Sequence, residues 1–324
     1  MKKIKKHLLS TIVSLLVLGN VACAPLPNTS GGSTKVDVTF VQEGIEEQVI
    51  SVERGATLSE LPSLIQPLDT TLVTEWNVAD GFVVSEQTTI ETTTYTKGLE
   101  FIDYTYQGKT IYAVSRYTGD AAKVIVPQYY KGGQVTQISE KVFQNNLTIT
   151  EVSLPEGITD IGILAFYRAK NLKTYNVPST LKYCRSSIFS DTICEGTLKI
   201  PDAVEEVGIR SFWATRFDTV YITGNTHTIK PFAFGGSNLK TVVWGTNLTN
   251  VSELAFYFQS IEEIFYMGDE NDWSSIVFEE YDYQKAPNGT ADPNLSFTNK
   301  TMKATKIYYA ADWEFVDGVP TPIK

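Results

Sequence analysis

One aromatic residue recurs at a nearly constant interval through the middle of this chain of 324 residues. The phenylalanines stand 22 or 23 residues apart, at Phe143, Phe166, Phe189, Phe212, Phe234 and Phe256. Self-similarity at a fixed period of this length is the signature of a repeat architecture, in which each period is one structural unit. The spacing therefore predicts a solenoid whose stacked turns place these phenylalanines in one continuous core.

Aliphatic residues keep the same interval and predict two short strands in each turn. The first strand is anchored five residues ahead of each phenylalanine, at Ile138, Ile161, Cys184, Val207, Ile229 and Val251. The second strand contributes Val152, Tyr175, Leu198, Val220, Val242 and Ile264, and then Leu154, Val177, Ile200, Ile222, Trp244 and Tyr266 two residues further on. No turn can bury its own apolar face, so we expect successive turns to stack as parallel strands and cover one another.

Residues between the buried positions of the second strand must point outward, because side chains alternate along a strand. One outward column is rich in threonine, at Thr174, Thr197, Thr219 and Thr241. The neighbouring column becomes apolar toward the end of the array, at Tyr221, Val243 and Phe265. An exposed apolar patch often marks a contact site, so these residues are the predicted ligand-contact face. The alternative is that the C-terminal segment folds over them.

The N-terminus predicts export. Four lysines in the first six residues precede an apolar run, and residues 1–23 have the form of a signal peptide. Cys23 follows the apolar run and precedes a Pro-, Gly- and Ser-containing tether, residues 24–34, which favours lipidation of this cysteine. The acyl chains would hold the protein on the outer face of the membrane. Ordinary cleavage at the Ala22-Cys23-Ala24 run is the alternative.

Residues 35–98 predict a separate small β-rich domain. The order of patterns is strand, strand, a short helical stretch ending near Pro67, strand, strand. Gly55 after a strand, Trp76 and a closing threonine-rich strand resemble the internalin-type B repeat of bacterial surface proteins. This resemblance implies a β-grasp-like module.

The repeat itself resembles the BspA-like leucine-rich repeat of bacterial surface proteins. The residues that match are Ile161, Ala165, Phe166, Leu172, Lys173, Val177 and Pro178. The resemblance covers residues 99–313 and leaves residues 314–324 as a C-terminal tail. It implies a mainly β leucine-rich-repeat solenoid with short helical turns and caps, used as an adhesive or binding surface module.

Few residues offer catalytic or metal-binding chemistry. Once the signal peptide is lost, His227 is the only histidine, and its spacing from Ile229 predicts an exposed turn residue. No nucleophile, nucleotide or zinc motif is present. The acidic run from Asp269 to Asp282 could offer oxygen ligands to calcium, but a solvated capping loop is the favoured interpretation, with Trp273 closing the core. Cys184 and Cys194 are interpreted as small buried hydrophobes, with a disulfide as the alternative.

These patterns together predict a non-catalytic cell-surface protein without a cofactor. The formal net charge is −10 and no basic stretch follows the signal peptide, which argues against a nucleic-acid partner. The expected partner is an extracellular protein or glycan, bound through the sheet face of the solenoid. A carbohydrate-binding accessory protein, with Tyr221 stacking on sugar rings, is the second hypothesis. An enzyme dependent on His227 is the third.

Overall fold

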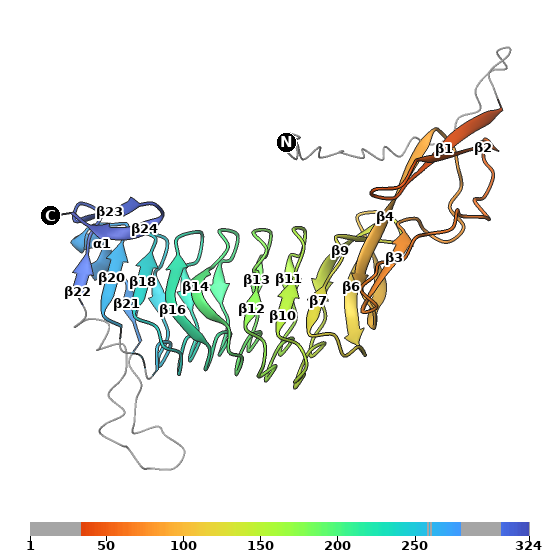
Figure 1. Ribbon diagram of the computed structural model, residues 1–324. Helices are drawn as coiled ribbons and strands as arrows, with labels where there is room; N and C mark the ends of the chain where they lie inside the picture. Colours follow the sequence, from red (N-terminus) through yellow and green to blue (C-terminus); the bar gives the residue numbers. More distant parts are fainter. Residues whose placement is uncertain (1–33, 258, 260, 280–305, 324) are drawn as a thin grey trace, which may run out of the picture. The chain divides into compact units, whose positions relative to one another are not determined.

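The computed structural model describes residues 34–257, 259, 261–279 and 306–323. The predicted signal peptide, Cys23, nearly all of the predicted tether, Glu280 and Asp282 lie outside the described residues. Residues 35–324 form one compact unit. Its larger part is a solenoid whose turns stack side by side, and whose strands lie on two faces (Figure 1).

The first face is a sheet in which one short strand from each turn pairs in parallel with the next. Its repeat strands are β9 (Gly133–Ile138), β11 (Asp160–Ile161), β13 (Tyr183–Cys184), β15 (Glu206–Val207), β17 (Thr228–Ile229), β19 (Asn250–Val251) and β21 (Val277–Phe278). A hairpin of β5 (Leu99–Tyr106) and β6 (Lys109–Tyr117) begins this sheet, and β8 (Tyr129–Tyr130) pairs with β9. The predicted anchors are in register, as in the pairing of Ile161 with Cys184.

The second face carries the other strand of each turn. These strands are β7 (Lys123–Ile125), β10 (Glu151–Ser153), β12 (Thr174–Tyr175), β14 (Glu195–Lys199), β16 (Arg216–Ile222), β18 (Thr241–Trp244), β20 (Glu263–Tyr266) and β22 (Lys306–Tyr308). The register joins Thr219 to Thr241 and Tyr221 to Val243, as the repeat alignment predicts. The inward columns belong to one continuous hydrophobic core.

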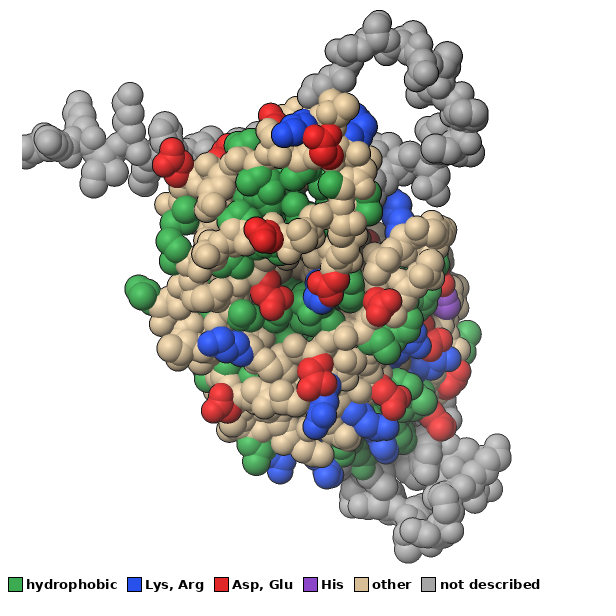
Figure 2. Space-filling model, turned by 90° about the vertical axis from the view of Figure 1, so that its right-hand side faces the viewer, with side chains coloured by type: hydrophobic (Ala, Val, Ile, Leu, Met, Phe, Trp, Pro, Cys, Tyr) green, Lys and Arg blue, Asp and Glu red, His purple; other side chains and the backbone are tan. Residues whose placement is uncertain are grey.

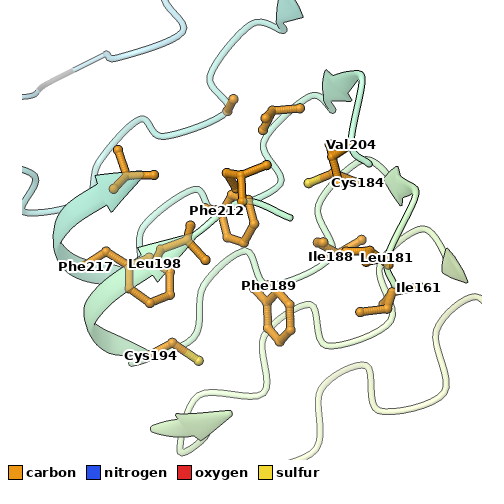
Figure 3. Close-up of a cluster of buried hydrophobic side chains, with 14 of the residues drawn as sticks. Ile161, Leu181, Cys184, Ile188, Phe189, Cys194, Leu198, Val204, Phe212 and Phe217 are labelled. Carbon is orange, nitrogen blue, oxygen red and sulfur yellow. The ribbon is translucent and has the colours of Figure 1, made fainter. Parts of the chain in front are cut away.

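The six repeating phenylalanines form a stacked ladder between the two faces, which confirms the predicted solenoid core. All six are buried. Successive ring centroids lie 4.9, 5.0, 6.0, 5.6 and 5.2 Å apart, and the planes of neighbouring rings differ by 18° or less. Cys184 and Cys194 are free and buried on opposite sides of this ladder, so the favoured interpretation of the cysteines is correct (Figure 3).

The N-terminal module is a four-stranded mixed sheet over residues 35–96. Its strands are β1 (Lys35–Val41), β2 (Gln48–Glu53), β3 (Leu72–Trp76) and β4 (Thr88–Thr96), in the order β2-β1-β4-β3, with β1 and β4 parallel. The predicted helical stretch is wrong, because Thr57 forms a β-bridge with Val83 and residues 58–67 are irregular. Pro62 interrupts this stretch and lacks the N–H that a helix needs. Its carbonyl instead accepts a hydrogen bond of 2.8 Å from Trp76 Nε1.

Hydrophobic side chains also reach the surface at this end of the molecule, as Figure 2 shows from the right-hand side of Figure 1. The exposed large hydrophobic residues of the N-terminal module are Ile45, Val49, Leu61, Ile65, Leu68 and Val83. Most of them lie on the edge strand β2 or in the irregular connections, whereas the module's own core is Val36, Val38, Phe40, Trp76, Val84 and Ile90.

The C-terminal end of the array is closed by an aromatic cap. Helix α1 (Glu270–Ser274) begins with a capping box between Asp269 and Asp272. It places Trp273 against Trp244, with 5.1 Å between ring centroids. The predicted role of Trp273 as the plug of the core is confirmed by this contact and by its burial.

The C-terminal residues are not a tail but a hairpin of β23 (Trp313–Val316) and β24 (Val319–Pro322) (Figure 1). This hairpin corrects the prediction that Tyr221, Val243 and Phe265 form an open contact face. They are only 9%, 0% and 1% exposed, and form a separate cluster with Tyr308 and Trp313. Strand alternation gave their direction correctly, because they point away from the phenylalanine ladder. The alternative, in which the C-terminal segment covers them, is the observed arrangement.

Candidate functional site

The second face of the solenoid is interrupted once among the described strands. Strands β7, β10 and β12 form one sheet, and strands β14, β16, β18, β20 and β22 form another. Strands β12 and β14 belong to successive turns, but they do not pair. On the first face the corresponding turns stay paired through β11, β13 and β15. The solenoid is therefore continuous on the first face and interrupted at this place on the second, beyond a bond from the Ile193 N–H to the Leu172 carbonyl.

The main-chain hydrogen bonds of the neighbouring turn show which strand pairing is absent at this break. At the end of β14, the Ile200 N–H donates to the carbonyl of Tyr221 at 2.9 Å. The equivalent bond one turn earlier would join the Val177 N–H to the carbonyl of Lys199. No such bond is present among the hydrogen bonds of the described residues. A return bond from residue 201 to the Val177 carbonyl is impossible, because Pro201 has no N–H.

Bulky aromatic residues beneath the surface accompany the break. Tyr175 occupies an inward column in which the five other residues are aliphatic, and its ring lies 5.1 Å from Phe189 and 5.4 Å from Phe217. In the following turn the register of β14 against β16 shifts between Gly196, with φ of +84°, and Thr197, and Asp218 of β16 is the extra residue. Burial raises the pKa of the Tyr175 phenol, so this ring is a neutral part of the core.

A hollow of about 430 Å³ lies over the break. It is lined by Lys173, Thr174, Tyr175, Asn176, Val177, Glu195, Thr197, Leu198 and Lys199. Lys173 Nζ and Glu195 Oε1 form an ion pair of 2.9 Å that joins the two turns at the beginning of β12 and β14. Both side chains are largely exposed, so this pair contributes little to stability and leaves the hollow open to solvent.

A second hollow, of about 480 Å³, continues from the first toward the C-terminal hairpin. Val177 and Lys199 line both hollows. The remaining lining residues are Ser179, Ile200, Pro201, Asp202, Tyr221, Thr223, Met267, Phe315 and Gly318. We call the two hollows together the outer-face groove.

Aromatic rings and a cation form the wall of the groove next to the hairpin. The Tyr221 ring stacks on Phe315, with 6.3 Å between centroids and 19° between planes. The Tyr221 hydroxyl donates to the Gly318 carbonyl at 3.2 Å, and Lys199 Nζ lies 5.4 Å from the centroid of the Tyr221 ring. Burial raises the pKa of the Tyr221 phenol. Phe315 remains 44% exposed, so this wall offers a hydrophobic ring beside charged and hydroxyl groups.

The groove contains part of the predicted contact face. Thr174 and Thr197 line it and are exposed, whereas Thr219 and Thr241 lie half-buried in the continuous sheet beyond it. Repeat analysis did not assign Lys199 or Phe315 to the site. The available signals were Tyr175, the aromatic residue of an otherwise aliphatic column, and Glu195, which stands 23 residues after Leu172 where the repeat calls for an apolar residue.

The other predicted chemical groups lie away from the groove lining. His227 is exposed, and its Nδ1 is 2.9 Å from the Thr228 hydroxyl. Asp269 and Asp272 cap helix α1. Within the described part of the chain, no group of three or more histidine, cysteine or acidic residues is placed to hold a metal ion. None of the described helices is long and apolar enough to cross a membrane.

Comparison with known proteins agrees with this architecture. Residues 135–280 match the BspA type leucine rich repeat region, in six copies. No curated protein matches the sequence. A leucine rich repeat protein from T. pallidum is 19% identical with a TM-score of 0.44, covering 52% of this chain and 83% of its own.

Two further solved structures are also similar. A leucine rich cell surface protein from Faecalibacterium prausnitzii is 19% identical with a TM-score of 0.44, and the match covers 69% of this chain and 59% of that one. A leucine-rich repeat protein from Bacteroides capillosus is 25% identical with a TM-score of 0.31, over 41% of this chain and 94% of its own.

Proposed function

Because residues 135–280 are a BspA-type leucine-rich repeat region, we propose that this protein is a non-catalytic binding protein of the cell surface. Its partner is an extracellular macromolecule that docks in the outer-face groove. The observation that carries this proposal is the break between β12 and β14, which opens a groove in an otherwise continuous stack of strands. Repeat proteins commonly bind partners along such extended surfaces.

The N-terminal sequence supports the surface location. Four lysines, an apolar run and Cys23 are features of an exported protein that is lipidated at this cysteine. In this proposal Cys23 anchors the protein to the outer face of the membrane, and the following residues tether the folded unit.

The position of His227 supports a non-catalytic role. It is the only imidazole left after removal of the signal peptide, and it stands in an exposed turn with the Thr228 hydroxyl as its side-chain neighbour. General base catalysis by histidine requires a positioned imidazole beside a nucleophile or a substrate-binding cleft. His227 does not line either hollow of the groove.

We favour a protein as the partner. A glycan is the second candidate, and one observation supports it. The exposed Phe315 ring stacks on Tyr221 beside Lys199 and Asp202, and this combination of an apolar ring with polar groups suits a sugar. The groove would be the docking site in both cases.

Binding of residues 24–324 to an array of extracellular-matrix proteins and glycans tests the proposal. The informative variant is Lys199→Ala/Phe315→Ala, which removes two partly exposed side chains from the groove. Its matched control is Lys182→Ala/Tyr183→Ala, which removes a lysine and an exposed aromatic ring from the first face, outside the groove. Both variants keep the phenylalanine ladder, and circular dichroism verifies that each is folded.

The expected result is one or more partners whose binding falls at least tenfold in the groove variant and less than twofold in the control. Protein partners would support the favoured candidate, and glycan partners the second one. Partners that bind both variants as well as the parent protein would place the binding surface elsewhere and overturn the proposal.

A further inference from the structure

We infer that the break between β12 and β14 receives an extended peptide segment of the partner, which inserts as an additional β-strand. The inference rests on the proposed function, because it assigns a chemical class to the partner at the same groove. It adds a binding mode, in which main-chain hydrogen bonds to both sides of the break hold the ligand.

The two sides of the break present complementary main-chain groups. In β14, the main chain of Leu198 and Ile200 is directed toward β16, as the bond from the Ile200 N–H to Tyr221 indicates. Since N–H and C=O groups alternate in direction along a strand, those of Thr197 and Lys199 face the break. The same alternation directs the main chain of Tyr175 in β12 toward the break, because Thr174 pairs with β10.

Unpaired strand edges are templates for another strand, and peptide recognition by strand addition uses them. Here two parallel edges from successive turns face the same hollow. Directly before these edges the two turns are still joined, because the Ile193 N–H donates to the Leu172 carbonyl at 3.1 Å. Paired strands lie about 4.8 Å apart, so an inserted strand requires the edges to open beyond this bond to roughly twice that distance. The hollow of about 430 Å³ provides space over these edges, and no strand of the described chain occupies it.

The length of the edges sets the length of the ligand. Strand β14 has five residues, which extend over roughly 16 Å at about 3.3 Å per residue. The ligand should therefore contribute about five residues to the pairing with β14, of which fewer can pair with the two-residue strand β12. Flanking residues would reach the Lys173–Glu195 ion pair at one end and the Phe315 wall at the other.

The surroundings of the break predict a sequence pattern in the ligand. A strand has one face toward the core and one toward solvent. On the core side, an inserted strand would meet Tyr175 and Leu198, which line the hollow. On the solvent side it would lie between Thr174 and Thr197. We therefore expect alternating apolar and polar residues. A glycan would have no such alternation and no regularly spaced amide N–H donors.

The test begins with a phage-displayed library of linear heptapeptides, selected on residues 24–324 of the protein. Affinities of the selected synthetic peptides are then measured by fluorescence anisotropy. The blocking variant is Thr197→Trp, whose side chain projects from the exposed face of β14 and fills the mouth of the break. The matched control is Ser153→Trp, at an exposed outward position of β10 where the sheet is continuous.

The same peptides are also synthesised with backbone N-methyl groups at odd or at even positions. N-methylation removes hydrogen-bond donors and retains the side chains. If the peptide pairs with both edges, each methylated series should bind at least tenfold more weakly. Thr197→Trp should cause a loss of similar size, whereas Ser153→Trp should change the affinity less than twofold.

Failure of this inference is distinguishable from failure of the proposed function. The inference is overturned if no peptide is selected, if Thr197→Trp does not weaken binding, or if one methylated series binds as well as the parent peptide. The proposed function is tested separately by the array and the Lys199→Ala/Phe315→Ala variant. If that variant loses its glycan partners and the peptide selection yields nothing, the groove remains the proposed binding site, but strand insertion is rejected.

Discussion

The side-chain amide of Asn176 pairs with the main chain of Leu154 as a further strand residue would. The Leu154 N–H donates to Asn176 Oδ1 at 2.7 Å, and Asn176 Nδ2 donates to the Leu154 carbonyl at 2.5 Å. In a regular parallel ladder that carbonyl would accept from the N–H of residue 178, which is Pro178 and has none. The asparagine supplies the missing donor, so β10 remains satisfied although β12 ends at Tyr175.

Replacing Asn176 with alanine should therefore destabilise the protein. Leu154 is buried, and its N–H and C=O would both lose their partner. The expected loss is about 1–3 kcal/mol in the free energy of unfolding, measured by urea denaturation. Asn176→Asp tests the donor separately: it retains an acceptor for the Leu154 N–H but places a carboxylate oxygen against the Leu154 carbonyl, so at pH 7 it should also be less stable than the parent. Equal stability of Asn176→Ala and the parent would mean that water replaces the amide without cost.

The phenylalanine ladder predicts a large effect of truncation in its interior. Phe166 is fully buried between Phe143 and Phe189. Phe166→Ala should cost about 3–5 kcal/mol in the free energy of unfolding. Tyr183→Ala removes an exposed ring in the next turn, beside Arg185, and should cost less than about 1 kcal/mol. Similar denaturation midpoints for the two variants would contradict the assignment of the ladder as the core.

Much of the fold could be predicted because the repeat supplies many independent copies of one pattern. The aliphatic anchors and the phenylalanines take the expected register, and the outward columns do so except at the break between β12 and β14. The helical stretch before Pro67 could not be predicted in this way, because it occurs once and its backbone is held by partners distant in sequence. Trp76 is one of these, through its bond to the carbonyl of Pro62.

The groove could be predicted only in part, since it forms where the repeat is least regular. Alternation along a strand gave the outward direction of Thr174 and Thr197. It could not indicate that β12 and β14 fail to pair, nor that the Tyr175 ring at this place packs against Phe217, because alternation carries no information on packing between turns. Nor could it identify Phe315, which reaches Tyr221 from a hairpin about ninety residues further along the chain.

Loss of the contacts that hold the C-terminal hairpin should expose the apolar cluster beneath it. Trp313 is buried against Phe265, with 5.3 Å between ring centroids, and its Nε1 donates to the Tyr266 carbonyl at 3.1 Å. Trp313→Ala should release the hairpin and increase the fluorescence of a bound hydrophobic dye several-fold at 25 °C. The dye should bind because Tyr221, Val243 and Phe265, which the hairpin buries, become exposed when it is released.

Val319→Ala serves as the control for this variant, because Val319 lies on the same hairpin and is 60% exposed. It should leave dye binding unchanged. Limited proteolysis provides a second measurement, in which new cleavage is expected between residues 313 and 323 in Trp313→Ala alone. Dye binding at the parent level in both variants would show that the hairpin stays in place without its tryptophan.

The two buried cysteines predict a specific pH dependence. Burial raises the pKa of Cys184 to about 11 and that of Cys194 to about 12, from an ordinary value of 9.0. Between pH 9 and its folded pKa, each buried thiol of the folded protein keeps the proton that the same thiol has lost in the unfolded chain. The contribution of each thiol to stability is therefore fully present below about pH 9 and is lost as the pH rises through the folded pKa.

Alkylation with iodoacetamide measures this protection in residues 24–324, which contain no other cysteine. At pH 8 the native protein should react at least a hundredfold more slowly than the urea-unfolded protein, because the thiolate is the reactive form and burial blocks access. The double variant Cys184→Ala/Cys194→Ala should show a smaller loss of stability between pH 9 and pH 11 than the parent. Rapid alkylation of the native protein at pH 8 would instead indicate that the core opens around these residues.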